Sequence, residues 1–271
     1  MVRMKEMKEI YGSWSLLAGA AEGLGEAYSI ALARRGMNII MVDNQDELLQ
    51  QLGKRLEKEY GISTRRMCLN LAEKDSADKI LEAVSETSCR LLIYNAAFSR
   101  IRRFLEYSQE DLDPYLEVNV RMPTRLAHGL LSHHKENRGP RKGIILMGSM
   151  AGLWGSGLLA PYGATKAYNI LLAEALHHEL KPGNVDVMAC VAGPTSTPAY
   201  LETHPSYGRI PVHVMSPQRV AEGALGSLGR RAFYIPGRRN RLNYFLLTRI
   251  LPRKTTARIF NRATGKMYPE R

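Results

Sequence analysis

Cysteine is scarce in this 271-residue chain, and long hydrophobic runs are absent. The three cysteines, Cys68, Cys89 and Cys190, form no CxxC motif and no paired spacing, so we expect a reduced, cytoplasmic protein. No apolar run approaches the roughly 18 residues that a membrane-spanning helix needs. The N-terminal segment MVRMKEMKEIYG mixes lysines with glutamates and has no apolar centre, which argues against a signal peptide.

Acidic side chains are nearly missing from the C-terminal segment. Residues 230–271 contain twelve Lys and Arg but a single acid, Glu270, so almost all of the formal net charge of +12 lies there. The rest of the chain is close to neutral, and the composition, 45% hydrophobic and 24% charged, is that of a globular protein with a sizeable core. The positive charge therefore bears on what the C-terminal segment binds, and it does not indicate the fold.

Short apolar runs alternate with longer amphipathic stretches, without any internal repeat or low-complexity segment. This alternation predicts an α/β fold, a single doubly wound domain whose parallel seven-stranded sheet carries helices on both faces. A long helix is expected over residues 112–134, and the proline-rich residues 193–217 are expected to form a long functional loop. The expected strands are 13–18, 38–42, 66–69, 90–94, 143–147, 186–191 and 232–235.

A glycine-rich turn follows the first expected strand. Gly19, Gly23 and Gly25 occur where the strand ends and a helix begins, and they leave room for a pyrophosphate at the helix N-terminus. Asp43 ends the second strand, where a carboxylate accepts hydrogen bonds from a ribose diol and repels a 2′-phosphate. Glu22 adds a negative charge, so the pattern favours NAD over NADP. The alternatives are an ordinary glycine-rich turn and an Asp43 that only caps the next helix.

A phenol and an ammonium group lie four residues apart in Tyr162-Gly-Ala-Thr-Lys166. The spacing puts both on one face of an expected helix, where the cation lowers the pKa of the phenol and makes it usable as an acid or base near neutrality. Such a pair also arises by chance in a chain with 13 tyrosines, so its value depends on its surroundings. Ser149 ends the strand before this helix, and Asn119 lies in the long helix before that strand.

The order of these residues resembles that of the short-chain dehydrogenase/reductase family. The shared motifs, over roughly residues 12–235, are the glycine turn, Tyr94-Asn95-Ala96-Ala97, Asn119 in VNV, Ser149 in GSMAG, Tyr162xxxLys166 and Ala192-Gly193-Pro194. The segment GEAYSIALARRGMNII further resembles the branch of hydroxysteroid dehydrogenases and long-chain 3-oxoacyl reductases. We therefore expect a Rossmann-type dinucleotide-binding and catalytic domain over residues 1–235, with 193–217 as its substrate loop, and a basic amphipathic extension over 236–271.

The resemblance also implies roles for individual side chains. Tyr162 is the expected general acid/base, and Lys166 is expected to lower its pKa and to hold the nicotinamide ribose. Ser149 is expected to hydrogen-bond the substrate oxygen, and Asn119 to support a water relay from Lys166. The implied NAD site comprises Gly19, Gly23, Leu24, Gly25, Asp43, Asn70, Leu71, Asn95, Ala96, Tyr162, Lys166, Gly193, Thr195 and Thr197. The adjacent histidines at 133–134 and 177–178 lack ligand spacing, so no metal is expected.

Four positions depart from the family pattern. Ala18, Asn70, Ala97 and Ala192 stand where Thr, Asp, Gly and Pro are usual, although none of these changes removes a catalytic group. The departures leave a second hypothesis open, in which the chain is a non-catalytic, NAD-binding scaffold or regulator associated with a membrane.

The expected substrate is a hydrophobic secondary alcohol or its ketone, steroid-like or acyl-like. Apolar and aromatic residues are candidates for the walls of its pocket, because pockets for lipophilic ligands are usually lined by such side chains. The alternative is that these loop residues only pack against the rest of the domain. The residues expected to bind it are Ser149, Trp154, Tyr162 and Tyr200, and further candidates for the walls are Phe98, Leu153, His204, Tyr207 and Met215.

Residues 240–271 interleave apolar with basic side chains, and Pro252 divides them into two short helices. This composition is typical of helices that lie on an anionic membrane surface. The alternative is that they pack over the substrate loop or against a neighbouring subunit. The family resemblance implies a homodimer or homotetramer through the helices that carry Asn119 and Tyr162. No recognition motif accompanies the charges, which argues against nucleic acid as a partner.

Overall fold

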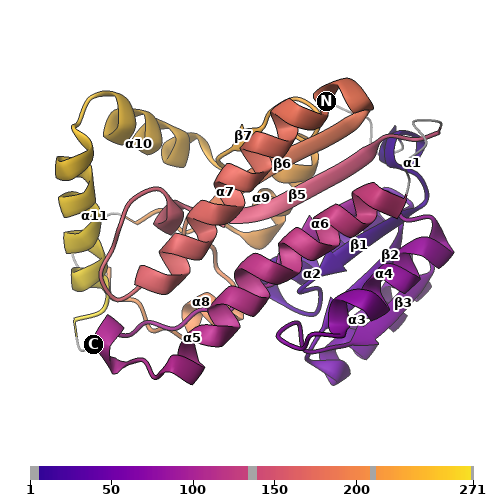
Figure 1. Ribbon diagram of the computed structural model, residues 1–271, viewed down its shortest axis with the longest axis horizontal. Coiled ribbons are helices and arrows are strands. Elements are labelled where there is room, and N and C mark those ends of the chain that lie inside the picture. The colour runs from indigo at the N-terminus through magenta and orange to yellow at the C-terminus, as the bar shows by residue number, and fades with distance from the viewer. Residues whose placement is uncertain (1–5, 134–138, 208–211, 270–271) are drawn as a thin grey trace.

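The computed structural model describes residues 6–133, 139–207 and 212–269 and contains a parallel seven-stranded sheet (Figure 1). The strand order is β3-β2-β1-β4-β5-β6-β7, and all neighbours are parallel. The strands are β1 (Trp14–Ala18), β2 (Asn38–Asp43), β3 (Thr64–Cys68), β4 (Leu91–Tyr94), β5 (Lys142–Ser149), β6 (Val185–Ala192) and β7 (Phe233–Tyr234). The predicted single, doubly wound α/β domain is confirmed. Two predicted segments, 112–134 and 193–217, include residues outside the described ranges, His134 and 208–211.

Helices cover both faces of the sheet, because successive strand residues point to opposite faces and both sets are apolar. Leu17 and Met41 pack in one core with α1 (Glu6–Tyr11), α2 (Gly23–Ala33), α3 (Asp46–Tyr60) and α9 (Pro217–Leu225). Their neighbours Leu16 and Ile40 pack in a second core with α4 (Ser76–Thr87), α6 (Met122–His133) and α7 (Ala160–Leu180). The sheet is therefore buried on both faces, so exposed functional side chains can lie only at the ends of its strands.

The long helix predicted over residues 112–134 is present in its described part but is not a uniform α-helix. The chain instead forms α5 (Gln109–Leu116), a π-helical turn η2 (Glu117–Arg121) and then α6. Pro123 explains the turn, since it has no N–H to donate to the Asn119 carbonyl four residues earlier, as an α-helix requires. Asn119 lies in this widened turn with its side chain fully buried.

Two helices follow the last strand, α10 (Arg238–Arg249) and α11 (Arg253–Met267), and Pro252 separates them as predicted. Figure 1 shows them together at one edge of the molecule. The backbone N–H of Ser206, in the substrate loop, donates to the carbonyl of Met267 at 2.9 Å. The structure therefore shows the tail packed against the substrate loop, one of the two arrangements considered above. In the described ranges, no helix combines the length and the apolar character that crossing a membrane requires.

Candidate active site

The candidate site lies at the carboxyl edge of the sheet, where the strand order reverses. The chain winds outward in one direction from β1 and in the other from β4, and open α/β sheets bind ligands at such a switch point. The glycine turn follows β1, Asn95 follows β4, and Ser149 ends β5. Parallel strands present their carboxyl ends at one edge, so these three features share it.

The glycine turn has no room for side chains. Gly19 has a φ of +76°, and a Cβ there would lie 2.7 Å from the backbone of Ala96. A Cβ on Gly25 would lie 1.9 Å from the carbonyl oxygen of Gly19. Asn95 holds the turn from β4, because its Nδ2 donates to the same carbonyl at 2.7 Å. With α2 starting at Gly23, the turn offers the bare backbone and helix N-terminus that a pyrophosphate needs.

Asp43 joins the end of β2 to this turn. Its Oδ2 accepts from the N–H of Ala21 at 2.9 Å, and its Oδ1 accepts from the N–H of Gln45 at 3.2 Å. Gln45, not Asp43, is the residue that precedes the first turn of α3, so the helix-capping alternative is not the geometry observed. Each carboxylate oxygen accepts more than one hydrogen bond, so Asp43 keeps acceptor capacity for a ribose diol. The bare turn and this carboxylate together fit a dinucleotide cofactor.

The other residues predicted near the adenine end are arranged less specifically. Asn70 is exposed, and its Oδ1 accepts from the N–H of Ala72 at 3.0 Å. Leu71 is buried, and Leu24 packs partly buried against the core. Their contact with a cofactor stays a prediction.

The start of the substrate loop approaches the glycine turn. A Cβ on Gly23 would lie 3.0 Å from the Cβ of Thr197, so Thr197 sits directly over the turn. Thr195 is buried, and its Oγ1 donates to the carbonyl of Gly193 at 2.9 Å. The loop thus brings the predicted threonines to the nucleotide side of the site.

Tyr162 and Lys166 lie on one face of α7, as their spacing predicts. The Nζ of Lys166 is 5.8 Å from the centroid of the Tyr162 ring and donates to the carbonyl of Met147 at 2.9 Å. The neighbouring Ser149 hydroxyl lowers the pKa of Tyr162, but burial raises this pKa by more, so the net shift is upward. The expectation that Lys166 lowers the pKa of Tyr162 therefore stays a prediction, because burial determines the net shift and the Lys166 ammonium is held by β5.

Asn119 connects three elements through its amide. Its Oδ1 accepts from the N–H of Phe98 at 2.7 Å, and its Nδ2 donates to the carbonyl of Phe98 at 2.8 Å. Nδ2 also donates to Oγ1 of Thr165 at 3.0 Å, and this hydroxyl donates to the carbonyl of Tyr162 at 2.9 Å. Asn119 therefore positions the first turn of α7, whereas its predicted water relay stays a prediction. Thr165, within the Tyr-Lys motif, is a contributor that the sequence analysis missed.

Lys166 gives the site a measurable pH dependence, because burial lowers its pKa to about 8 from the ordinary 10.5. Between these values the unfolded chain holds a proton that the folded chain does not, so Lys166 makes stability rise with pH. From pH 8 to pH 10 we expect the free energy of unfolding to rise by about 2 kcal/mol relative to Lys166→Met, measured by urea denaturation of both proteins.

The comparison with Lys166→Met is necessary because other buried groups act in the opposite direction. Burial raises the pKa of the Cys89 and Cys190 thiols to about 12, so the unfolded chain releases their protons first as the pH rises. Both proteins keep these thiols, and their effect cancels in the difference. The same pH dependence in both proteins would contradict a lowered pKa for Lys166.

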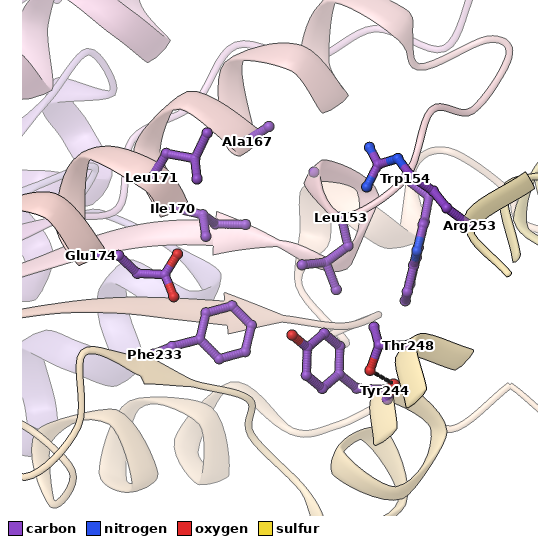
Figure 2. A pocket seen from close by; sticks show the side chains of 11 residues that line it. Leu153, Trp154, Ala167, Ile170, Leu171, Glu174, Phe233, Tyr244, Thr248 and Arg253 are labelled. Atoms are coloured by element: carbon purple, nitrogen blue, oxygen red, sulfur yellow. Dashed lines mark hydrogen bonds between the residues drawn. The ribbon is translucent and has the colours of Figure 1, made fainter. Parts of the chain in front are cut away.

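Trp154 and Leu153 turn toward the C-terminal helices. Figure 2 shows them lining a pocket of 310 Å³ with side chains of α7, β7 and α10. The ring of Trp154 packs against Phe260 of α11, with centroids 5.6 Å apart, and neither Tyr162 nor Ser149 lines this pocket. A contact between Trp154 and substrate therefore stays a prediction.

Tyr200, within the predicted substrate loop, contacts α11. Its hydroxyl accepts from the hydroxyl of Tyr207 at 3.1 Å and faces the sulfur of Met267 at 3.9 Å. Elsewhere in the predicted walls, Met215 is buried and paired with Thr195 by a β-bridge. The remaining predicted wall residues are Phe98, partly buried, and His204, exposed.

The tail contacts the loop that connects Ser149 to Tyr162. Asn261 Oδ1 accepts from the N–H of Gly157 at 2.8 Å, and the hydroxyl of Ser156 donates to that of Thr264 at 2.8 Å. The sequence analysis named none of these residues. It considered packing of the tail only as a general alternative to membrane binding.

Residues 13–207 match the sequence profile described as short chain dehydrogenase. The chain belongs to the short-chain dehydrogenase family. Members of this family are oxidoreductases that act on alcohols and ketones with a nicotinamide cofactor, so the expected family and its general chemistry are confirmed.

Two relatives indicate the branch. A 7β-hydroxysteroid dehydrogenase of Clostridium sardiniense is 32% identical over 234 residues, which cover 86% of this chain and 89% of the relative. A very-long-chain 3-oxoacyl-CoA reductase of Lodderomyces elongisporus is 28% identical over 232 residues, which cover 81% of this chain and 64% of the relative. Both names agree with the branch that the sequence resembles.

Solved structures share the fold. One, from work on the stereoselectivity of a 7β-hydroxysteroid dehydrogenase, has a TM-score of 0.83 at 24% identity and covers 93% of this chain and 98% of its own. A short-chain dehydrogenase of Sphingobium yanoikuyae in complex with NADPH has a TM-score of 0.74 at 25% identity, covering 86% and 91%. The second structure shows that an NADP-type cofactor occurs on this fold, so the choice between NAD and NADP depends on residues of this chain.

Proposed function

We propose that the protein is an NAD(H)-dependent oxidoreductase that interconverts a hydrophobic secondary alcohol and its ketone. The observation that carries the proposal is the placement of Tyr162 on α7, with the Nζ of buried Lys166 5.8 Å from its ring centroid and with Ser149 close enough to lower its pKa, beside a glycine turn without side chains. In this proposal the hydroxyls of Tyr162 and Ser149 hold one substrate oxygen between them. The non-catalytic scaffold has no comparable observation in its favour.

Each catalytic side chain has a proposed task. When bound, NAD supplies the hydride acceptor or donor. Tyr162 exchanges a proton with the substrate oxygen as general acid/base, and Ser149 donates a hydrogen bond to that oxygen. Lys166, with its Nζ between β5 and the Tyr162 ring, holds the nicotinamide ribose when the cofactor binds. Asn119 acts at a distance, because it positions the turn of α7 that carries Tyr162.

The proposed substrate is steroid-like or acyl-like. The names of the two relatives, a 7β-hydroxysteroid dehydrogenase and a 3-oxoacyl-CoA reductase, support a lipophilic ligand. The aromatic side chains of Tyr200 and Tyr207 in the loop beside the site support the same class.

We further propose a cytoplasmic homodimer or homotetramer. The exposed apolar residues on α5 and α7, Leu116 and Leu171, are 57% and 67% accessible, and Tyr168 on α7 is 37% accessible. A second copy packed on these helices would bury them. No disulfide joins any two cysteines of the described residues, which agrees with a reducing compartment.

The preference for NAD tests the role of Asp43. A carboxylate beside the ribose repels the 2′-phosphate of NADPH, so we expect NADH to bind at least about tenfold more tightly than NADPH. In Asp43→Asn this ratio should fall to within about threefold, because the charge is removed and an acceptor for the N–H of Ala21 remains. Fluorescence titration of both reduced cofactors measures each Kd.

The control is Asp46→Asn, an exposed acid in the first turn of α3. It removes the same charge three residues away and should leave the ratio unchanged. Tighter binding of NADPH by the unaltered protein would contradict the proposed cofactor while leaving the reaction class standing.

A further inference from the structure

The outward side of α11 carries a continuous row of positive charge. Lys254, Arg258, Arg262 and Lys266 recur at intervals of four residues, and all are exposed. The intervening residues Thr256, Phe260 and Thr264 form the opposite, inward row, with Thr256 and Thr264 buried. Like charges four residues apart destabilise a helix, so this row is a cost unless something anionic binds it.

Among the described residues, the basic side chains of the tail have no acidic partner. The guanidinium of Arg241 donates to the carbonyl of Ile235 at 3.3 Å. In the described part of the tail, no other Arg or Lys side chain from 238 onward forms a hydrogen bond or an ion pair, and residues 238–267 contain no acid. The described acids of the rest of the chain therefore form no ion pair with these charges.

The outward side of α10 combines apolar and basic residues. Leu242, Phe245 and Leu246 are 57%, 55% and 40% exposed, and Arg249 follows at the next turn. This is a helical stripe at intervals of three and four residues. The inward side of the same helix holds the buried Asn240 and the partly buried Tyr244, so the exposure belongs to one face.

Exposed apolar side chains also occur at the junction of α10 and α11 and along α11. Ile250, at the end of α10, is 64% exposed, and Ile259 on α11 is 44% exposed. Figure 1 shows α10 and α11 joined at one edge of the molecule, and Thr256 of α11 donates to the carbonyl of Leu247 at 2.7 Å. We call these outward residues the tail surface: Arg238, Leu242, Phe245, Leu246, Arg249, Ile250, Lys254, Arg258, Ile259, Arg262 and Lys266.

We propose that the tail surface binds the headgroup region of an anionic lipid bilayer. Apolar side chains flanked by arginines and lysines suit this partner, because the apolar groups enter the acyl boundary while the cations meet phosphates. A second copy of the chain would oppose this acid-free surface with an identical one, and like charges would repel. Nucleic acid would neutralise the charge but leave the exposed leucines and phenylalanine in water.

The proposal does not depend on the catalytic function. The inward side of α11 already binds the loop at Ser156 and Gly157 and the substrate loop at Ser206. The tail surface lies on the other side of these helices, so lipid binding leaves the catalytic residues in place.

Vesicle sedimentation of the full chain tests the proposal. We expect binding to phosphatidylcholine vesicles that contain about 30% phosphatidylglycerol, weak binding to pure phosphatidylcholine, and loss of binding in about 0.5 M NaCl. The charge variant Arg258→Gln/Arg262→Gln should weaken binding by about 10- to 30-fold. Its control is Lys54→Gln/Lys58→Gln, which removes two exposed charges from α3 and should bind as the unaltered protein does.

A second pair of variants tests the apolar contribution. Phe245→Ser should weaken binding to the anionic vesicles several-fold, whereas Leu105→Ser, at a residue 95% exposed elsewhere on the surface, should not. All these positions are exposed, so the variants should keep the unaltered protein's thermal unfolding midpoint.

Three results would overturn the proposal. The first is equal sedimentation with neutral and anionic vesicles, or with neither. The second is binding to a DNA duplex that responds to Arg258→Gln/Arg262→Gln while the vesicles do not bind. The third is a dimer in solution that Phe245→Ser dissociates, because a second copy would then cover the tail surface.

Discussion

Replacing Tyr162 with Phe should lower kcat by about 10²- to 10⁴-fold, the range that general acid/base catalysis supplies. The substitution removes one hydroxyl and keeps the ring that lies beside Lys166. The Kd for NADH should therefore stay within about twofold. Initial rates with a hydroxysteroid and fluorescence titration with NADH measure the two quantities on the same protein.

Tyr168→Phe is the matched control for this substitution. Tyr168 lies on the same helix, is 37% exposed, and its hydroxyl pairs with that of Thr124 at 2.9 Å, away from the site. Its loss should leave kcat unchanged. If Tyr162→Phe kept full turnover, the proposed acid/base role would be wrong, and the scaffold hypothesis would regain support.

Gly25→Ala should have the largest effect on folding and on cofactor binding together. The added Cβ would lie 1.9 Å from the carbonyl oxygen of Gly19, and a backbone atom cannot move aside as a flexible side chain does. We expect the free energy of unfolding to fall by about 1–3 kcal/mol, as in other overpacked sites. The displaced turn should also weaken NADH binding, because its backbone N–H groups no longer converge. Urea denaturation and NADH titration measure the two effects.

Gly155→Ala gives the comparison for a glycine with open space around it. A Cβ at Gly155 meets no atom within 4 Å, and its φ is not in the left-handed region. This variant should bind NADH normally and unfold at the same urea concentration. Equal behaviour of the two variants would mean that the close approach of Gly25 to Gly19 does not shape the turn.

The nucleotide side of the site could be predicted from sequence because its determinants are local. A left-handed or crowded position demands glycine, so Gly19 and Gly25 are visible without a structure. The placing of Tyr162 and Lys166 on one face follows from helical spacing alone. The seven parallel strands follow from apolar runs alternating with amphipathic ones, although several boundaries differ by one or two residues.

The sequence analysis missed two features, one that depends on burial and one that depends on which backbone N–H groups can donate within a helix. The spacing argument expected a lower pKa for Tyr162, whereas burial, which the sequence does not report, raises it. The π-helical turn at Asn119 did have a signal, since Pro123 stands where its N–H would be needed. The spacing of apolar residues alone does not reveal such a turn.

The direction of Trp154 depends on a contact between distant parts of the chain. Its partner Phe260 lies on α11, more than 100 residues later, and the loop around Trp154 is tied to the same helix through Gly157 and Asn261. Neither hydrophobic periodicity nor composition shows which of two apolar surfaces a loop residue packs against. The tail therefore forms part of the wall of the pocket that Trp154 lines.

The most direct test of the account is the reduction of NAD⁺ by the purified protein with a panel of hydroxysteroids, followed as absorbance at the nicotinamide band. We predict that at least one hydroxysteroid supports turnover with NAD⁺, more slowly with NADP⁺, and that Tyr162→Phe lowers this turnover by about 10²- to 10⁴-fold. A protein that binds NADH but turns over neither hydroxysteroids nor long-chain secondary alcohols, with either cofactor, would contradict the proposed function.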